Sequence, residues 1–349
     1  MSRAWTETEV KDILDLRANK KWSWGDIGTR YGVTSEAART IARKYGGYGA
    51  QPTERFSVKA PEESPGDVLQ KLPDSQLREM MSSRGYFVEK LTPDKSDLRY
   101  QIDPAMFDGE VARFGALSCT HLGSKHQQLT HLHSFYQYAE SKGVRVIFHA
   151  GDMVDGIDVY RGQEYEIFQH GVDAQRDYAI KNYPRLGNGG KTYVISGNHD
   201  YSFMQKAGTD IVKQISLERD DIEYLGSYGA FPSILGLNIY LQHGGGGKAY
   251  ARSYKMQKNI EDMTPDKKPD IYLLGHYHSS CILLEYRNVT AFQLPSFQAQ
   301  TPYARRHGWP AETGAFIVTI TSNDRERKDG ISKVEFEFVP FYVPIDKDF

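Results

Sequence analysis

This sequence has few cysteines, no long apolar run and no large excess of charge of one sign. Its 349 residues include two cysteines, Cys119 and Cys281, so at most one disulfide can form, and free thiols are expected in a reducing compartment. No apolar run approaches the roughly 20 residues of a membrane-spanning helix, and the first residues lack the apolar core of a signal peptide. A net charge of −2 excludes a global attraction to nucleic acid. We therefore expect a cytoplasmic protein without membrane association, whose contacts with nucleic acid, if it makes any, are local.

The first part of the chain, residues 6–45, has the pattern of a small helical unit. Thr6 is a suitable cap for a first helix, with acidic residues in the turn that follows. A second helix ends at Gly32, and Thr34 or Ser35 begins a third. A short helix, a glycine-containing turn and a further helix are typical of the helix-turn-helix. The segment resembles the homeodomain-like helix-turn-helix units of resolvases and small regulators.

Basic residues on the predicted third helix bear on the role of this unit. Arg39, Arg43 and Lys44 lie on the helix that would enter the groove of DNA. Residues 1–50 contain nine Lys or Arg against six Asp or Glu. DNA contact is therefore the first hypothesis. A three-helix bundle that packs on the main domain or on a protein partner stays open as the alternative, because the excess of positive charge is modest.

Composition divides the chain further. A helix-turn-helix domain of residues 1–46 is followed by residues 47–65, which are rich in Gly, Pro, Ser and charge without any period and predict a linker. Residues 66–110 are expected to form a helical or extended connecting region, and the sequence does not indicate its role. Residues 111–349 alternate short β-branched runs with helical stretches, which is typical of a layered α/β domain.

The α/β part of the chain has a regular order of predicted elements. The expected strands are 111–119, 144–150, 191–196, 237–243, 269–274, 281–286, 289–294, 314–321 and 332–342. The expected helices are about 126–142, 163–182, 201–218 and 249–262. The later strands follow one another without helices between them, which predicts a second sheet packed on the first.

Polar side chains follow several of these predicted strands at the point where each strand ends. In an open α/β sheet, the loops beyond the carboxyl ends of the strands meet at one crevice. Carboxylate, amide and imidazole groups gathered there are ligands for divalent ions, and there are enough of them for two ions. The residues are Cys119, His121, Asp152, Asp155, Asn198, His199, Asp200, His243, His276 and His278.

Each of these clusters has an ordinary interpretation when it is taken alone. The sequence Gly-Asn-His-Asp at 197–200 is a plausible turn, and a single histidine such as His243 is more often a structural residue. Several such clusters, in this order and each at a strand end, are not expected of independent turns. A metal site is therefore the better explanation.

The ordered motifs GD-x-x-D, GNHD, a histidine before glycine and GH-x-H resemble those of the calcineurin-like metallophosphoesterases over roughly residues 111–300. The resemblance implies a four-layer α/β/β/α sandwich, preceded here by the small all-α domain, and two divalent ions, with Mn²⁺ expected in vitro. It implies that one ion binds Cys119, His121, Asp152 and His278. It implies that the other binds Asp152, Asn198, His243 and His276. It also implies a catalytic His199 that Asp155 orients.

Cys119 lies where the family has a metal-binding aspartate, in the segment LSCTHLG at 117–123. One hypothesis is that its thiolate is a ligand, which favours Zn²⁺ or Fe²⁺ at that ion because sulfur is a soft donor. The other hypothesis is that the thiol stays protonated and the first ion binds weakly, so that the ion at Asn198, His243 and His276 carries the reaction. The first is slightly favoured, because the other ligands of the first ion are all present.

Two ions beside a histidine suit the hydrolysis of phosphodiesters by an activated water, so we expect a metal-dependent phosphodiesterase. Two narrower resemblances favour a DNA nuclease with exonuclease-like action. THLGS at 120–124 resembles repair nucleases that partner SMC-like ATPases, and residues 151–167 resemble the small exonuclease subunits of archaeal family-D DNA polymerases. No coiled-coil-binding helix is evident near the C-terminus, so DNA is the expected partner and an SMC-type ATPase is not. A gene of this make-up suits a phage.

Two other functions stay open at this point. One is a phosphatase or cyclic-nucleotide phosphodiesterase whose helical unit recruits it to a partner. The other is a regulatory DNA-binding protein that keeps a weakened metal site as a scaffold. Activity on DNA, small phosphodiesters and cyclic nucleotides separates these functions.

Residues near the expected rim of the site are candidates for substrate binding. The segment 296–309 combines Tyr303 and Trp309, which can stack on bases, with groups that can hold phosphates, namely Arg305, Arg306 and His307. Further candidates at the same rim are Tyr160, Arg161, Lys125 and Lys248. A solvated surface loop explains 296–309 equally well.

Overall fold

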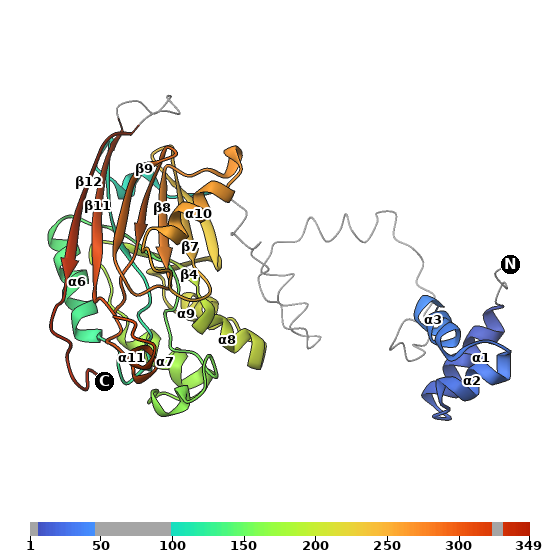
Figure 1. Cartoon of the computed structure of the whole chain (residues 1–349). Coiled ribbons are helices and arrows are strands. Elements are labelled where there is room, and N and C mark those ends of the chain that lie inside the picture. Colours follow the sequence, from blue (N-terminus) through green and yellow to red (C-terminus); the bar gives the residue numbers. More distant parts are fainter. Residues whose placement is uncertain (1–5, 46–98, 323–330) are drawn as a thin grey trace, which may run out of the picture. The chain divides into compact units, whose positions relative to one another are not determined.

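The computed structural model describes residues 6–45, 99–322 and 331–349 (Figure 1). The chain separates into two compact units, one within residues 1–90 and the other within residues 91–349. The predicted linker, 47–65, and most of the predicted connecting region, 66–110, lie outside the described residues. The four-part division of the chain therefore stays a prediction.

The first unit consists of α1 (Glu7–Ala18), α2 (Trp24–Tyr31) and α3 (Ser35–Tyr45). The Thr6 hydroxyl accepts a hydrogen bond from the backbone N–H of Glu9 at 3.3 Å and so caps α1. Gly32 ends α2 in the left-handed conformation, with a φ of 65°. The Thr34 hydroxyl accepts from the N–H of Ala37 at 3.2 Å at the start of α3. The predicted N-terminal helices are confirmed.

The inner faces of these helices share a small apolar core, and the outer face of α3 is polar. Ile13 and Ile27 are fully buried in the core. Arg39 is exposed and forms an ion pair with Glu36 at 3.6 Å. Arg43 and Lys44 belong to α3, but their side chains lie outside the described part of the structure. Contact between this unit and DNA therefore stays a prediction.

The second unit contains the predicted α/β elements and some further ones. Its strands are β1 (Arg99–Gln101), β2 (Val111–Leu117), β3 (Val146–His149), β4 (Lys191–Ser196), β5 (Ile222–Ser227), β6 (Gly229–Ile234), β7 (Leu237–His243), β8 (Ile271–Gly275), β9 (Cys281–Tyr286), β10 (Val289–Gln293), β11 (Gly314–Ser322) and β12 (Ile331–Pro340). Its α-helices are α6 (Leu129–Ser141), α7 (Val172–Asn182), α8 (Asn198–Ala207), α9 (Ile211–Glu218), α10 (Tyr254–Asp262) and α11 (Pro302–Arg306).

These elements form a sandwich of two six-stranded sheets with helices on the outer faces (Figure 1). The first sheet has the order β1-β6-β7-β8-β10-β9, and the second has the order β12-β11-β2-β3-β4-β5. Side chains of both sheets, such as Phe148 and Phe292, meet in one buried core between them. Helices α6 to α9 pack on the second sheet and α10 packs on the first. The predicted four-layer α/β/β/α fold is confirmed.

Two predicted helices have different bounds in the structure. The predicted helix 201–218 is two helices, because Gly208 ends α8 with a φ of 67° and the Asp210 side chain caps α9. The predicted helix 163–182 becomes α-helical only from Val172 onward. In both cases a local turn interrupts an apolar pattern that reads as one helix.

Three strands and one short helix have no counterpart in the prediction, namely β1, β5, β6 and α11. Gly226, Gly229 and Pro232 break the apolar alternation of β5 and β6, and such residues weaken the sequence signal of a strand. The short helix α11 lies inside the segment 296–309, which was expected to be a loop. Its cap is Thr301, whose hydroxyl accepts from the N–H of Ala304 at 3.1 Å.

The parallel strands of both sheets end in segments that touch one another. In the second sheet β2, β3 and β4 are parallel neighbours, and in the first sheet β7 and β8 are parallel neighbours. Asn198, directly after β4, contacts His243 at the end of β7. His276, directly after β8, contacts Cys119, which follows β2. The site is therefore built on the seam between the two sheets.

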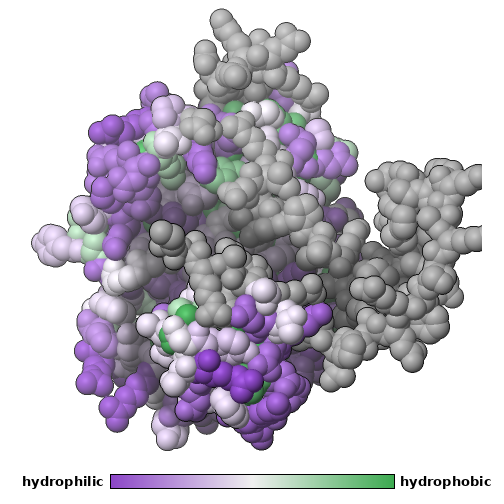
Figure 2. All heavy atoms as spheres, turned by 90° about the vertical axis from the view of Figure 1, so that its right-hand side faces the viewer, coloured by the Kyte–Doolittle hydropathy of each residue, from purple (hydrophilic) through white to green (hydrophobic). Residues whose placement is uncertain are grey.

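The visible surface of the described residues is mostly polar. Figure 2 shows hydrophilic side chains with small, separate hydrophobic spots on the face turned to the viewer. The exposed apolar residues Leu217 and Leu284 belong to different elements, α9 and β9. Within the described ranges, no helix combines the length and the apolar character needed to cross a membrane.

A buried ion pair joins the end of α9 to the end of α7 and predicts a large effect on stability. The Arg219 guanidinium is 3% exposed and donates two hydrogen bonds of 2.7 Å to Asp221. It also donates to the carbonyls of Ile180 and Tyr183 at 2.9 Å. Arg219→Ala leaves the carbonyls without this donor and leaves the carboxylate only the exposed Arg185 at 3.2 Å, so we expect the free energy of unfolding to fall by about 3–5 kcal/mol.

Urea unfolding followed by circular dichroism measures this change. The matched control is Arg185→Ala, because Arg185 pairs with the same Asp221 at 3.2 Å but is 52% exposed. Exposed ion pairs contribute little, so the control should unfold close to the wild type. Equal unfolding midpoints for the two variants would contradict the expectation.

Candidate metal centre

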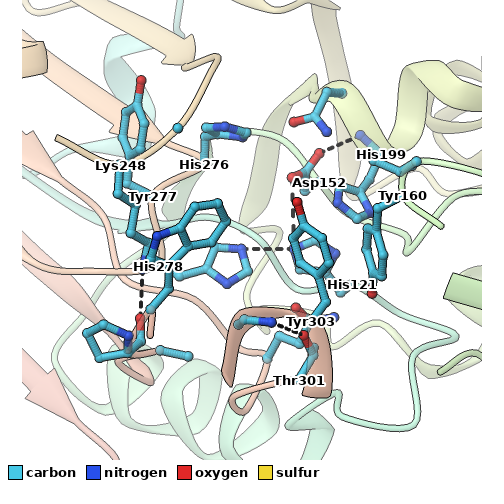
Figure 3. Close-up of a pocket in the computed structure, with 18 of the residues that line it drawn as sticks. His121, Asp152, Tyr160, His199, Lys248, His276, Tyr277, His278, Thr301 and Tyr303 are labelled. Carbon is cyan, nitrogen blue, oxygen red and sulfur yellow. Dashed lines mark hydrogen bonds and ion pairs between the residues drawn. The ribbon is translucent and has the colours of Figure 1, made fainter. Parts of the chain in front are cut away.

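Several predicted ligand residues come together beside one pocket, and Figure 3 labels His121, Asp152, His276 and His278 among them. The donor atoms of Cys119, His121 and His278 lie within 4.8 Å of one another. The same limit holds for Cys119, Asp152 and His243. Strands β2 and β3 of the second sheet deliver Cys119, His121 and Asp152, and strands β7 and β8 of the first sheet deliver His243 and His278. Residues from both sheets therefore face one small volume.

Hydrogen bonds on the outer nitrogens orient three of the imidazoles. The Nδ1 atom of His121 lies 3.0 Å from Asp155 Oδ1, and Nδ1 of His243 lies 2.7 Å from the Ala150 carbonyl. Nε2 of His276 lies 3.0 Å from the Gly246 carbonyl. Each acceptor takes a proton from the nitrogen that it faces, so the lone pair of the other nitrogen points into the cluster. This is the arrangement that a metal-binding histidine needs.

Asp152 lies between the two predicted ligand sets. Its Oδ2 atom is 3.0 Å from His243 Nε2 and 3.8 Å from His121 Nε2. Its Oδ1 atom accepts the backbone N–H of His199 at 2.9 Å. Burial alone would raise the pKa of Asp152, but the surrounding histidines outweigh burial and hold it well below the usual range. The carboxylate therefore stays ionised, and its charge is available to a cation.

Burial keeps most of the cluster histidines neutral. It lowers the pKa of His276 to about 4 and lowers the pKa of His121 and of His278 as well. Burial also acts against protonation of His243, but the Asp152 carboxylate reverses this and raises the pKa of His243. Neutral imidazole is the form that binds a metal. The donor set thus fits divalent cations.

The second predicted ligand set is also contiguous. Asn198 Oδ1 lies 3.0 Å from His243 Nε2, and His276 Nδ1 lies 3.3 Å from the same nitrogen. Both residues are partly exposed, as are His199 and His278, whereas Cys119 is completely buried. The inner side of the cluster is therefore closed and the outer side opens into a pocket. The binding of particular ions by particular residues stays a prediction.

Cys119 is an acceptor in a closed environment. Its Sγ atom accepts hydrogen bonds from the Ser118 hydroxyl and from the His276 N–H, both at 3.3 Å. Burial, and after it the Asp152 charge, raise the pKa of the thiol well above its usual range. The protein groups alone favour the neutral thiol, so the thiolate depends on the charge of a nearby cation. Both hypotheses for this residue stay open.

Five residues of the cluster have a left-handed backbone. This conformation is uncommon outside glycine and costs about 1–3 kcal/mol at each residue. The strain is concentrated in the loops that follow β2, β3 and β8, and it turns the side chains toward the seam. The residues and their φ values are Cys119 (55°), His121 (46°), Asp152 (59°), His276 (86°) and His278 (49°).

Two glycines allow the loops to approach one another. A Cβ atom on Gly197 would lie 2.2 Å from Asp152 Oδ1. A Cβ atom on Gly275 would lie 2.3 Å from the Ala150 carbonyl oxygen. Real Cβ atoms do not approach other atoms so closely, so both positions require glycine if the loops are to keep this arrangement.

Asp155 contacts two histidines in different ways. Its carboxylate lies 3.0 Å from His121 Nδ1 and 3.9 Å from His199 Nδ1, while its backbone carbonyl lies 2.5 Å from His199 Nδ1. The side-chain amides of Gln163 and Gln298 also donate to the carboxylate, at 3.1 and 3.0 Å. No motif in the sequence marks these glutamines, because they reach Asp155 only in the folded chain.

The pocket beside the cluster has a volume of about 290 Å³. Of the predicted substrate-binding residues, Tyr160 and Lys248 line it. Four other predicted substrate-binding residues are exposed and do not line the pocket, namely Arg161, Arg305, Arg306 and His307. Lys125 also lies outside the lining, and its ammonium donates to the Tyr165 carbonyl. Three further aromatic residues line the pocket, namely Tyr277, Tyr303 and Trp309. Tyr303 and Trp309 are the two residues that the sequence predicted to stack on bases.

The sequence profile of the calcineurin-like phosphoesterases matches residues 112–300. The matched range contains every predicted metal ligand.

Individual proteins with similar sequences share about a quarter of their aligned residues with this chain. The DNA polymerase II small subunit of Archaeoglobus fulgidus is 26% identical over 232 residues, which is 54% of this chain and 47% of that protein. The DNA polymerase II small subunit of Methanothermobacter thermautotrophicus is 25% identical over 195 residues, 46% of this chain and 40% of that protein. The chain thus spans less than half the length of these curated relatives. Among solved structures, Vps29 of Chaetomium thermophilum has a TM-score of 0.33 and 10% identity, covering 66% of this chain and 97% of that one.

Gly197 provides a test of the metal centre that leaves every predicted ligand in place. In Gly197→Ala the added methyl group displaces Asp152, so we expect Mn²⁺ affinity to fall about 10- to 100-fold, the range seen when the support of a metal ligand is lost. Isothermal titration calorimetry with Mn²⁺ measures the affinity. The matched control is Gly245→Ala, because a Cβ atom there meets nothing within 4 Å. Unchanged affinity in a folded Gly197→Ala protein would count against this site.

Proposed function

The chain belongs to the calcineurin-like phosphoesterase family, and we propose that its substrate is the phosphodiester backbone of DNA, cleaved in an exonuclease-like manner. The family assignment makes it a metal-dependent phosphoesterase. The observation that carries the proposal is the placement of Asp152 between two contiguous sets of candidate ligands, with His199 beside them at the pocket. Such a site suits an anionic ester with a poor leaving group.

The proposed ligands divide as the resemblance implies. One ion would be held by Cys119, His121, Asp152 and His278, and the other by Asp152, Asn198, His243 and His276. When bound, the two divalent ions supply positive charge against the phosphoryl oxygens and lower the pKa of water. Mn²⁺ is the ion proposed in vitro, and Zn²⁺ or Fe²⁺ would suit a site that includes the Cys119 thiolate.

His199 is proposed to protonate the departing oxygen. Its Nδ1 atom donates to the Asp155 carbonyl at 2.5 Å, which leaves Nε2 as the nitrogen that would carry the proton given to the leaving oxygen. The ring is 13% exposed and lines the pocket, where a substrate would meet it. Asp155 holds the imidazole in place and is a positioning residue. A proton from Nε2 neutralises the alkoxide as the bond to phosphorus breaks.

Support for DNA as the substrate comes from two sources. The curated relatives are named as DNA polymerase II small subunits. The N-terminal helices have the helix-turn-helix pattern, and the exposed Arg39 lies on the third of them. A helix-turn-helix would hold the chain on DNA through contacts to the backbone and bases. DNA is therefore the partner that we propose.

Replacement of His199 tests both the reaction and the substrate. With Mn²⁺, we expect the wild type to degrade an end-labelled oligonucleotide and His199→Ala to do so about 10²- to 10⁴-fold more slowly, because the alkoxide lacks a proton donor. With bis-p-nitrophenyl phosphate the loss should be smaller, since p-nitrophenolate leaves without a proton. Rates from gel electrophoresis and absorbance measure the two effects.

The outcomes separate the candidate functions. Cleavage of bis-p-nitrophenyl phosphate or of a cyclic nucleotide, without cleavage of DNA, would make the chain a small-ester phosphodiesterase and refute the nuclease proposal. Binding of DNA without hydrolysis of any ester would identify a DNA-binding regulator.

Substitutions of Cys119 test whether its sulfur is a ligand. If it is, Cys119→Ala should retain about one of two tightly bound ions, and Cys119→Asp should retain both while shifting preference from Zn²⁺ toward Mn²⁺. Metal analysis of the purified proteins by mass spectrometry measures both results. Cys281→Ala is the matched control, because that thiol is partly exposed and belongs to none of the groups of clustered donor atoms. Two tight ions and full activity in Cys119→Ala would eliminate the ligand hypothesis.

A further inference from the structure

The pocket beside the metal centre is small compared with the sites that bind most organic ligands. Its volume of about 290 Å³ lies at the lower end of the range of about 300–1,000 Å³ for such sites. Asp152 and His199 belong to its lining, so an occupant would lie directly against the reacting groups. A space of this size suits one nucleotide and is too small for a base pair.

Aromatic rings form one side of this pocket. Tyr303 on α11 stacks on Tyr160 with the ring centres 4.2 Å apart and an angle of 23° between the planes. Trp309 meets Tyr303 nearly edge-on, at 5.9 Å and 75°. In Figure 3, Tyr160 and Tyr303 lie side by side next to His199 and His121. Tyr303 and Trp309 thus form an apolar corner next to the metal centre, in which a base can lie on the face of one ring and against the edge of the other.

Hydrogen bonds to the Trp309 backbone fix the segment that carries these rings. The Trp309 N–H donates to the Ala304 carbonyl at 2.9 Å, and the Gln300 amide donates to the Trp309 carbonyl at 2.7 Å. The imidazole of His307 stacks on the indole at 4.8 Å and 27°. The aromatic wall is thus positioned before any ligand arrives, which reduces the entropy lost on binding.

A cation faces the rings from another part of the chain. The Lys248 ammonium donates to the Pro310 carbonyl at 2.7 Å, which places it next to Trp309. Burial lowers the pKa of Lys248 to about 8, so the group is still mainly charged at pH 7. One hydrogen bond leaves two N–H groups of the ammonium for other acceptors. The pocket therefore offers an aromatic surface and a positive charge within the length of a nucleotide.

We infer that this pocket takes the unpaired terminal nucleotide of a DNA strand, with its base against Tyr303 and Trp309 and a phosphate at Lys248. The inference rests on the proposed nuclease function and specifies its substrate as a single-stranded end. In a duplex the terminal base is paired with a base of the other strand, so it can enter a pocket of this size only after it separates from its partner. Stacking accepts every base, so the site selects strand ends without selecting sequence.

The test uses oligonucleotides with and without a terminal base. Single strands labelled at either end are compared with matched strands whose terminal nucleotide is abasic. Stacking on an aromatic residue contributes an amount equivalent to about 5- to 150-fold in kcat/KM. We expect the wild type to prefer the strand with the base by a factor in this range, and to prefer single strands to blunt duplexes.

Substitutions of Trp309 and of Lys248 should affect different kinetic properties. Trp309→Ala should lose most of the preference for the terminal base, and Trp309→Phe should keep most of it. Lys248→Ala should raise KM for strands with and without the base by the same factor, because the phosphate contact does not depend on the base. Tyr250→Ala, which removes a fully exposed ring outside the pocket lining, is the control and should behave as the wild type.

The outcomes distinguish this inference from the proposed function. An equal preference for the terminal base in the wild type and in Trp309→Ala would overturn the stacking site. Equal rates on blunt duplexes and single strands would also overturn it, and faster hydrolysis of a cyclic nucleotide than of strand ends would identify a free nucleotide as the occupant instead. Absence of cleavage of every oligonucleotide would refute the nuclease proposal itself.

Discussion

A buried carboxylate needs positive charge close to it, and the imidazoles that surround Asp152 come from both sheets. Its two oxygens face the imidazoles of His243 and His121 and the backbone N–H of His199. The outer nitrogens of the first two rings are committed to acceptors, so their inner lone pairs point toward the same volume as the carboxylate. A group of acceptors facing one another in this way is satisfied by cations. The orientation of the loops, the burial of the ligands and the position of the pocket all follow from this requirement.

The fold accepts local strain to produce this arrangement. Left-handed residues such as Asp152 and His276 point their side chains to the seam, and Gly197 allows the carboxylate to lie directly against the loop after β4. The rest of the sandwich supplies the stability that holds these loops, through a core between the sheets and a second core under the helices. The strained loops thus hold the candidate site, and the two apolar cores contribute most of the stability of the domain.

The sequence predicted the residues of the site better than it predicted their geometry. Asp152, Asn198 and His243 could be found because each follows an apolar run and the turns after strands converge. No local sequence pattern predicts the left-handed backbone of Cys119 or the amides around Asp155, because both depend on contacts between distant segments. Strands β5 and β6 were missed because glycine and proline interrupt their alternation. The helix α11 did have a signal, since Thr301 before a proline is a common helix start.

The position of the ligands on the seam gives the metal centre a mechanical role. Cys119, His121, Asp152 and Asn198 follow strands of one sheet, whereas His243, His276 and His278 belong to the other. A cation held by both groups is a cross-link between the two layers, and it binds the folded chain but not the unfolded one. Sliding of one layer over the other would change the distances between the proposed ligands. The affinity of the site for a cation therefore depends on how the two layers are aligned. Ions held by these residues would therefore serve the proposed reaction and would also cross-link the two layers of the sandwich.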